Sequence, residues 1–363
     1  MPRVESVHTV GPSPAAAAAS PDPRGSSVAA RILIGLPDSI TAAALGLCVP
    51  LMVLLLLSQF RLGLTLPLGL AGAVAAVWLV RAPAGQVPRG AVLSSAGAVV
   101  FAAGWLAYNL NYTAQDVYTT RDPATYTITG RWLVNHASAV IHTYPDVFGT
   151  PAHGEVASGS FAAVGAGTLN AQGNHLLPAV LGFTGAIFGS GAIFKTNVVI
   201  GALALLVLFG LGRRLVNGPA ALLAMIAFGL SMPFIYVSRD TYTEPLTMLF
   251  LLGGLSLLHR ANRSWLVRDF ALAGLAAGSA AMVRIDSYPA LAGFVAAALV
   301  FAAVAPPSRR RAALARAGVL LAGAGGTALL GWLDLVRLSQ QYYGSLHGTI
   351  ITSLVGVLAA LIV

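Results

Sequence analysis

The chain has little charge and almost no cysteine. Of its 363 residues, 9% are charged and 57% are hydrophobic, and the mean hydropathy is +0.79. Soluble domains carry roughly 25% charged residues, so the composition excludes an ordinary soluble domain and predicts an integral membrane protein. The one cysteine, Cys48, lies in an apolar run. This excludes a disulfide framework and a cysteine-based metal site.

The N-terminal segment also lacks an apolar core. Residues 1–30 are rich in Pro, Ala and Ser, which predicts a disordered cytoplasmic tail and no cleavable signal peptide. The formal net charge of +9 would suit a nucleic-acid ligand in a soluble protein. No RNA- or DNA-binding motif accompanies it, so we attribute the charge to membrane topology and expect no nucleic-acid partner.

Long apolar runs dominate the rest of the chain and predict transmembrane helices. The ten predicted spans are 36–57, 65–80, 91–108, 194–212, 219–236, 243–258, 270–284, 288–305, 315–333 and 349–363. The further run "HLLPAVLGFTGAIFG" (175–189) is marginal for a span, because helices rise about 1.5 Å per residue and the hydrocarbon core is about 30 Å thick. The predicted fold is an all-α polytopic membrane protein with about ten transmembrane helices.

The positive-inside rule decides how the run 175–189 is placed. If it does not cross, and the N-terminus is cytoplasmic, the 21 Lys and Arg residues divide 14 inside to 7 outside; if it crosses, the division becomes 9 to 12. We therefore predict that 175–189 is a helix on or dipping into the outer leaflet. The predicted location is the plasma (inner) membrane, with several spans and a cytoplasmic N-terminus.

This topology gathers the polar chemistry on the outer face. All ten tyrosines lie there or at its membrane edge, and so do eight of the twelve acids. These acids are Asp116, Asp122, Asp146, Glu155, Asp240, Glu244, Asp286 and Asp334. The long loop 109–174 also lies outside, and loops above about 12–15 residues are usually functional or disordered. Its stretch "ATYTITGRWLVNHA" predicts a juxtamembrane helix, and we expect an active site on this face.

The first candidate site is "YTTRDPATYTITGRWL" (118–133), in which Asp122 precedes Pro123 and Tyr126 follows one helical turn later. Asp before Pro is an ordinary helix N-cap. A carboxylate just above the membrane could instead accept a proton from a substrate hydroxyl. Both interpretations stay open on the sequence.

The second candidate consists of acid–arginine pairs at the outer ends of three helices. The pairs are Arg239 with Asp240 in "SRDTYTEPLT", Arg284 with Asp286, and Arg337 with Asp334. Exposed ion pairs contribute little to stability. Charges near hydrocarbon usually face a cavity, however, and arginine binds phosphate oxygens bidentately. The pairs therefore predict a polar vestibule that holds a phosphate headgroup.

The histidines show no metal-ligand spacing, so we predict no dedicated metal site and leave a divalent cation open as a cofactor. His175 begins the half-span helix in "GNHLLP". It is either an interfacial histidine or a substrate ligand.

Residues 91–305 resemble the GT-C superfold of membrane glycosyltransferases, in particular the bacterial relatives of protein mannosyltransferases and of the aminoarabinose transferase of lipid A. The resemblance rests on the order of "RDPATYTITGRWL", "HLLPAVLGFTGAIFG", "LGRRLVNG", "RDTYTEPLTMLF" and "LAGLAAGSAAMVRIDSYP". It implies a core at 91–305 with an outer loop at 109–193. The core follows two spans at 31–90 and precedes further spans at 306–363. Many relatives carry an outer C-terminal domain or additional spans after this region, so the resemblance leaves open whether the sequence is a fragment or a minimal form.

The resemblance also implies a polyprenyl-phosphate-linked sugar donor and a lipid, glycan or protein acceptor in the cell envelope. Asp122 matches the family's loop acid that acts as base, and Glu244 matches the acid before proline in a later loop. The family's acid pair is reduced here to Asp122-Pro123, which puts metal assistance from that position in question. The implied reaction is inverting sugar transfer, with Asp122 as the base.

The predicted substrate-binding residues comprise the outer acids and arginines together with one tyrosine and one histidine. They are Tyr126, His175, Arg239, Asp240, Glu244, Arg284, Asp286 and Arg337. We expect Glu244 and Asp240 to line the donor pocket opposite Asp122, with Arg239 facing the lipid phosphate. A transporter or flippase for a lipid-linked or anionic substrate is the alternative. It is less favoured because transporters place polar groups at the bilayer midplane.

Overall fold

The structure is a computed structural model that describes residues 27–80, 87–118, 121–143, 160–165 and 167–362. The predicted disordered tail lies outside these residues up to position 26. Its last residues do not fit the prediction, because the first helix begins at Val28 and is capped by the Ser27 hydroxyl, which accepts from the Ala30 N–H at 3.2 Å. Asp146 and Glu155 of the predicted outer loop also lie outside the described residues.

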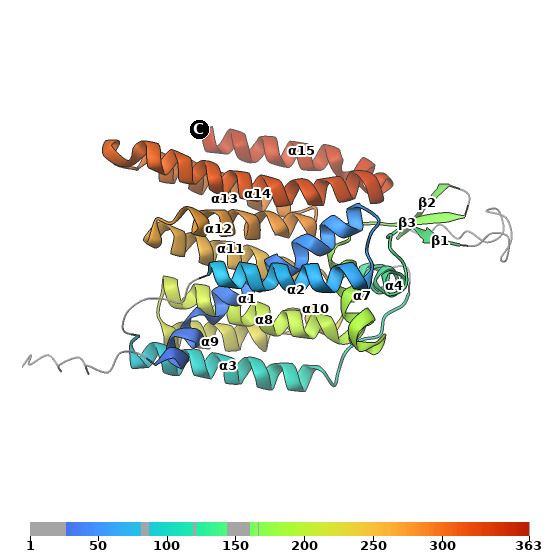
Figure 1. Cartoon of the computed structure of the whole chain (residues 1–363), viewed down its shortest axis with the longest axis horizontal. Coiled ribbons are helices and arrows are strands. Elements are labelled where there is room, and N and C mark those ends of the chain that lie inside the picture. The colour runs from blue at the N-terminus through green and yellow to red at the C-terminus, as the bar shows by residue number, and fades with distance from the viewer. Residues whose placement is uncertain (1–26, 81–86, 119–120, 144–159, 166, 363) are drawn as a thin grey trace, which may run out of the picture.

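The described residues form a bundle of long helices with a small sheet at one end (Figure 1). The first helices are α1 (Val28–Leu56), α2 (Leu62–Leu79), α3 (Arg89–Asn109) and α4 (Asp122–Leu133). The middle helices are α7 (Leu176–Phe188), α8 (Gly191–Leu215), α9 (Gly218–Gly229), α10 (Met232–Arg239) and α11 (Glu244–Ser264). The last are α12 (Val267–Ser279), the 3₁₀ turn η1 (Ala280–Met282), α13 (Ser287–Ala303), the 3₁₀ turn η2 (Pro307–Arg309), α14 (Arg310–Leu338) and α15 (Gln340–Ile362).

Every predicted span coincides with a helix or a pair of helices, but fewer of them meet the requirements of a span. Within the described residues, five segments are long and apolar enough to cross a membrane: α1, α2, α3, α8 and Pro307–Leu338. A sixth is obtained if α9 and α10, which meet at 64°, count as one broken span. The all-α multi-pass character is therefore confirmed, while the number of ten spans stays a prediction.

The predicted long outer loop contains a sheet that the sequence interpretation missed. Strands β1 (Ile141–His142), β2 (Phe161–Gly165) and β3 (Thr168–Ala171) pair antiparallel in the order β1-β3-β2. The strands are short, and β2 and β3 contain three Ala and one Gly, residues with low β propensity, which explains why their pattern carries no clear signal. The sheet lies beside α4 at the right-hand end of the bundle in Figure 1.

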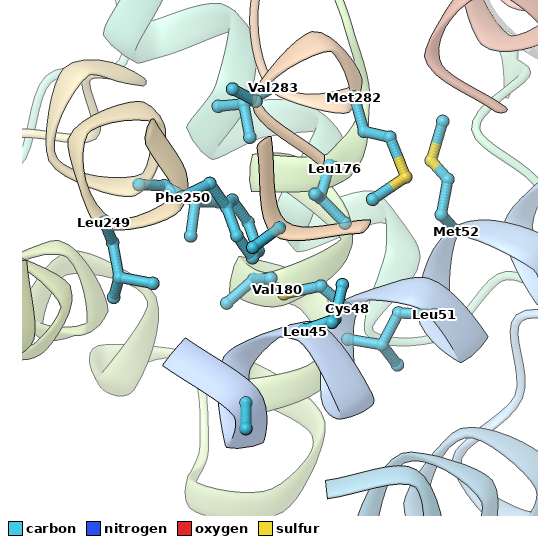
Figure 2. Packing of buried hydrophobic residues seen from close by; sticks show 14 of the residues in the cluster. Leu45, Cys48, Leu51, Met52, Leu176, Val180, Leu249, Phe250, Met282 and Val283 are labelled. Atoms are coloured by element: carbon cyan, nitrogen blue, oxygen red, sulfur yellow. The ribbon is translucent and has the colours of Figure 1, made fainter. Parts of the chain in front are cut away.

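The short helix α7 is confirmed, and it lies in the centre of the core rather than on the bundle surface. Its residues from Leu176 to Phe183 are buried without exception. Figure 2 shows α7 between α1, α11 and the chain after η1. The labelled side chains are Leu45, Cys48, Leu51, Met52, Leu176, Val180, Leu249, Phe250, Met282 and Val283. This packing fixes the position and direction of α7 within the bundle. Helix α7 can therefore act as a rigid support for α4.

Helix α4 packs against α7 through a close backbone contact. A Cβ at Gly182 of α7 would stand 2.7 Å from the Leu133 Cβ and 3.0 Å from the Gly130 carbonyl oxygen. Only glycine therefore allows the two helices to approach this closely. Because Asp122 is the first residue of α4, the position of its carboxylate depends on this contact.

At the far end of α8 from α7, four helices are joined by a buried ionic cluster. Arg214 of α8 binds Asp38 of α1 with two hydrogen bonds, of 2.8 and 2.6 Å. Arg260 of α11 lies 3.3 Å from Asp38 and 3.3 Å from Asp269 of α12, and the Ser264 hydroxyl donates to Asp269 at 2.6 Å. We call Asp38, Arg214, Arg260 and Asp269 the Asp38 cluster. It holds together the end of the bundle for which the sequence predicts a cytoplasmic location.

Candidate functional site

A cavity of about 270 Å³ opens between α4, the turn after η1 and the start of α15. We call it the central cavity. It is lined by Asp122, Tyr126, Gly173, Asn174, Val283, Arg284, Ile285, Asp286, Pro289, Tyr342 and Leu346. Four of the predicted site residues meet here: Asp122, Tyr126, Arg284 and Asp286. They come from two regions of the chain about 160 positions apart, which only the fold brings together.

Asp122 does not cap its helix. It is the first helical residue, Arg121 occupies the N-cap position, and no side chain of that position bonds to the helix. The N-cap interpretation of Asp122 is therefore wrong. Its side chain is exposed toward the central cavity, and among the described residues its carboxylate has no hydrogen-bond or ion-pair partner. The negative charge at the start of α4 is favourable with respect to the helix dipole, and the oxygens stay free to accept a proton.

Tyr126 follows one turn later and forms part of the cavity floor. It is buried, and the position that a Cβ would take on Gly173 lies only 3.2 Å from its hydroxyl oxygen. Gly173 has φ +87, a left-handed backbone conformation that favours glycine. Burial, and then the negative charge of Asp122, raise the pKa of Tyr126. The phenol therefore stays protonated and can donate a hydrogen bond into the cavity.

Arg284 holds two carboxylates at the cavity wall. Its Nη1 donates to the Glu244 carboxylate at 2.6 Å and to the Thr243 hydroxyl at 3.0 Å. Its Nε and Nη2 donate to Asp286, with distances from 2.8 to 3.1 Å. We call Glu244, Arg284 and Asp286 the Arg284 cluster. The predicted pairing of Arg284 with Asp286 is confirmed, and Glu244 joins them from the N-terminus of α11.

A second hollow, of about 340 Å³, lies on the other side of the Arg284 cluster, between α11 and α13. We call it the side groove. Its polar end consists of Glu244, Arg284 and Asp286, and its apolar wall includes Met248, Leu251 and Ala290. Arg284 and Asp286 line both the central cavity and the side groove. Glu244 therefore lies beside the central cavity, in the adjoining hollow, and not directly opposite Asp122 within it.

Arg239 and Asp240 lie elsewhere, and the ion pair predicted between them does not form. Arg239 donates to the Asn109 side-chain oxygen at 2.7 Å and stacks over Tyr112, with its guanidinium carbon 5.0 Å from the ring centroid. Asp240 is buried and accepts from the Thr241 backbone N–H at 2.8 Å. Both residues are absent from the described linings of the central cavity and the side groove. The expectation that they face the donor from opposite Asp122 is not supported by this geometry.

The stretch 238–247 instead positions α4. The Thr241 hydroxyl donates to the Pro123 carbonyl at 2.7 Å and accepts from the Thr127 hydroxyl at 2.9 Å. The side-chain amide of Asn197 on α8 holds the same loop by donating to the carbonyls of Val237, Asp240 and Tyr242. These bonds fix the first turn of α4, which carries Asp122.

The predicted pair of Arg337 with Asp334 does not form either. Asp334 is buried and accepts from the backbone N–H of His175 at 2.7 Å and from its ring Nδ1 at 2.9 Å. Arg337 is exposed one turn further along α14. His175 is buried at the start of α7 and does not line the central cavity, but it fixes the position of Asn174, which does.

Asn174, Gly173 and Tyr342 are cavity residues that the sequence interpretation did not select. Asn174 donates to the carbonyls of Ala281 and Gly331, each at 3.2 Å, and its buried side-chain oxygen has no partner among the described residues. Asn174 stands next to His175 in the quoted "GNHLLP", so that motif was the available signal. Tyr342 was one of ten outer tyrosines, and nothing in its local pattern distinguished it.

In the part of the chain that the structure describes, no group of three His, Cys, Asp or Glu side chains is arranged to hold a metal ion. The residues of the central cavity therefore do not form a protein-built metal site of the usual three or more ligands. The divalent cation that the sequence left open as a cofactor stays a prediction.

Comparison with known proteins supports a membrane glycosyltransferase. Residues 176–332 match the family described as dolichyl-phosphate-mannose-protein mannosyltransferase. No curated protein and no solved structure matches the chain. The match confirms the predicted resemblance to GT-C membrane glycosyltransferases and, together with the apolar helices, indicates a multi-pass membrane protein of the transferase class. It covers α7 to α14, with the Arg284 cluster, and leaves Asp122 outside.

Proposed function

We propose that the protein transfers a sugar from a polyprenyl-phosphate donor to a hydroxyl of a cell-envelope lipid, glycan or protein at the outer membrane face. The observation that carries this proposal is that Asp122 and Arg284 line one cavity of about 270 Å³. A carboxylate that can accept a proton and a guanidinium that can bind a phosphate are the two groups this reaction requires. The family match to residues 176–332 supports the donor class.

In the proposed reaction, an oxygen of the acceptor hydroxyl attacks the anomeric carbon of the donor sugar from the face opposite the phosphate. The new carbon–oxygen bond forms as the bond between the anomeric carbon and the phosphate oxygen breaks, which inverts the configuration. Asp122 takes the hydroxyl proton, and the polyprenyl phosphate leaves with the electron pair. Arg284 stabilises the negative charge that develops on the leaving group. The Tyr126 phenol, which stays protonated, orients the sugar by donating a hydrogen bond.

The side groove supports a lipid-linked donor. A polyprenyl phosphate has an anionic head next to a long apolar chain, and the groove has the same order of surfaces, from Arg284 to Met248 and Leu251. The head would then lie at Arg284, in the wall that the groove shares with the central cavity. The sugar would extend from there toward Asp122.

The experiment is transfer from radiolabelled polyprenyl-phosphate sugar to crude envelope acceptor, with the purified chain in detergent or nanodiscs. Asp122→Asn keeps the size of the side chain and removes its basicity. We expect transfer to fall by about 10²–10⁴-fold, the usual contribution of a general base, with unchanged yield and thermal unfolding.

The matched control is Asp116→Asn, because Asp116 lies in the same outer loop and accepts from the Tyr118 N–H at 2.9 Å without lining either hollow. We expect near-normal transfer from this variant. Near-normal transfer by Asp122→Asn would remove Asp122 from the mechanism. Absence of any donor turnover by the wild-type chain would contradict the proposed function itself.

A further inference from the structure

A third hollow, of about 190 Å³, lies between the sheet and the first turn of α15. We call it the polar cavity. Its described lining is Ser160, Phe161, Ala162, Val164, Asn170, Ala171, Gln172, Ser339, Gln340, Gln341, Tyr342 and Ser345. Tyr342 lines both the polar cavity and the central cavity. The two cavities are therefore neighbours with one side chain in their common wall.

The chemistry of the polar cavity differs from that of the other two hollows. None of the described residues that line it is charged, and most of its polar groups are side-chain amides and hydroxyls. Each of these groups can both donate and accept hydrogen bonds, as each hydroxyl of a sugar can. A lipid phosphate would find no cation among the described residues here.

Asn170 gives an independent indication that a ligand belongs in this cavity. The residue is 94% buried, and its side-chain oxygen has no hydrogen-bond partner among the described residues. A buried acceptor without a donor is costly and calls for an explanation. Asn170 lines the cavity from β3. Its unpartnered oxygen is enclosed, so a rotation of the side chain would bring this oxygen to a hydroxyl bound in the cavity.

The shared wall connects this cavity to the proposed base. The pKa of Tyr342 is raised by burial and then by the negative charge of Asp122, so the carboxylate lies within electrostatic reach of the phenol. The turn before Tyr342 is also firmly held. The Ser339 hydroxyl lies 2.6 Å from the Ala171 carbonyl oxygen and 2.8 Å from that of Gly173, which joins the start of α15 to β3 and to the floor of the central cavity.

We propose that the polar cavity is the acceptor subsite and that it binds a neutral carbohydrate, whose reacting hydroxyl passes Tyr342 to reach Asp122. This inference rests on the proposed function, and it narrows the acceptor from lipid, glycan or protein to glycan. The donor and the acceptor then approach Asp122 from different sides, the donor past Arg284 and the acceptor past Tyr342.

The first test measures binding without the donor. Mannobiose is added to the purified full chain in nanodiscs, and saturation-transfer NMR reports contact with the sugar. The variants are Gln172→Ala and Gln341→Ala, on opposite sides of the cavity, and the matched control is Gln59→Ala, an exposed glutamine that lines none of the three hollows. We expect binding to the wild-type chain and the control, and weaker binding to both variants.

The second test measures transfer from a short-chain polyprenyl-phosphate mannose to mannobiose, with an acetylated Ser/Thr peptide as the competing acceptor. We expect each glutamine variant to raise KM for mannobiose about tenfold, as for the loss of one or two hydrogen bonds. KM for the donor should stay unchanged, and the peptide should not serve as acceptor.

The outcomes separate the two proposals. Transfer to the peptide but not to mannobiose, or a rise in donor KM with unchanged acceptor KM, overturns the acceptor assignment and leaves the transferase function intact. Failure of mannobiose to bind the wild-type chain also overturns the assignment. Mannobiose binding that both variants weaken, in a chain that never turns over any donor, overturns the proposed function and keeps the carbohydrate site.

Discussion

The two ionic clusters are built from the same groups and differ in their surroundings. In the Asp38 cluster, the carboxylates of Asp38 and Asp269 are 2% and 0% exposed. In the Arg284 cluster, Glu244 and Asp286 are 38% and 61% exposed and border two hollows. Buried charges must keep their partners, whereas exposed ones can exchange theirs with water or a ligand. The first cluster therefore joins helices, and the second is available to bind a substrate.

The largest effect on stability is expected at the buried cluster. Asp38→Asn removes the charge that faces Arg214 and Arg260 and leaves both guanidinium groups short of a partner. We expect a loss of about 3–5 kcal/mol in the free energy of unfolding, as for other buried pairs that lose one member. Thermal unfolding in detergent measures it, with Asp286→Asn as the exposed counterpart, for which we expect at most about 1 kcal/mol. Equal losses at the two positions would contradict the comparison.

A smaller effect, on activity alone, is expected from Arg284→Lys. Lysine keeps the positive charge but not the planar fork that contacts Glu244 and Asp286 together. We expect kcat/KM for the donor to fall about 10–100-fold, the cost of losing a hydrogen bond to a charged group, with little change in thermal unfolding. Arg337→Lys is the control, because that arginine is exposed and lines none of the three hollows. An equal fall in the control would show that charge on the outer face, and not the cluster, determines activity.

The smallest effect is expected at Asp240, which lies near the Arg284 cluster in sequence but outside both hollows. Burial raises the pKa of its carboxyl, so the folded state holds this proton more tightly than the unfolded state does. The wild-type chain therefore loses stability as the pH rises from the usual aspartate pKa, about 3.9, through the raised folded value. Above that window the carboxylate is charged and burial penalises it.

Asp240→Asn removes this loss and keeps an oxygen for the Thr241 N–H. We expect the variant to gain stability relative to the wild-type chain as the pH rises, by less than about 1 kcal/mol at neutral pH, with transfer unchanged. Unfolding measured at pH 4 and pH 7 checks the sign. A clear loss of transfer would return Asp240 to the donor site that the sequence suggested.

The sequence predicted the helices well because their signal is local. Apolar run length marked the long helices of the bundle. The short length of 175–189, together with the distribution of Lys and Arg, identified α7 as a half-length helix. The resemblance, predicted over residues 91–305, was supported by the family match from residue 176 onward. Asp122, Tyr126, Arg284 and Asp286 were placed on one predicted face because all four lie at the ends of elements, and the structure brings them to one cavity. Their roles there stay predictions.

The contacts between side chains could not be predicted in the same way. Arg239 and Asp240 are adjacent in sequence, but the helix ends between them, so their side chains leave in different directions. Asp334 and Arg337 have the i, i+3 spacing that lets side chains meet on a helix. Asp334 nevertheless turns into the core toward His175, a partner 159 positions away. Which face of α14 is buried depends on packing with distant helices, and no local pattern contains that information.

The two carboxylates that contact Arg284 affect how the proposed donor would bind. A guanidinium without hydrogen-bond acceptors would be unfavourable beside an apolar groove. Here Glu244 and Asp286 accept hydrogen bonds from Arg284. In the proposed reaction, an arriving lipid phosphate would compete with these two carboxylates for the guanidinium. Under the proposed function, binding of the donor would thus exchange one anion for another at Arg284. It should be favoured by a high local concentration of lipid in the membrane and opposed by high salt in the medium.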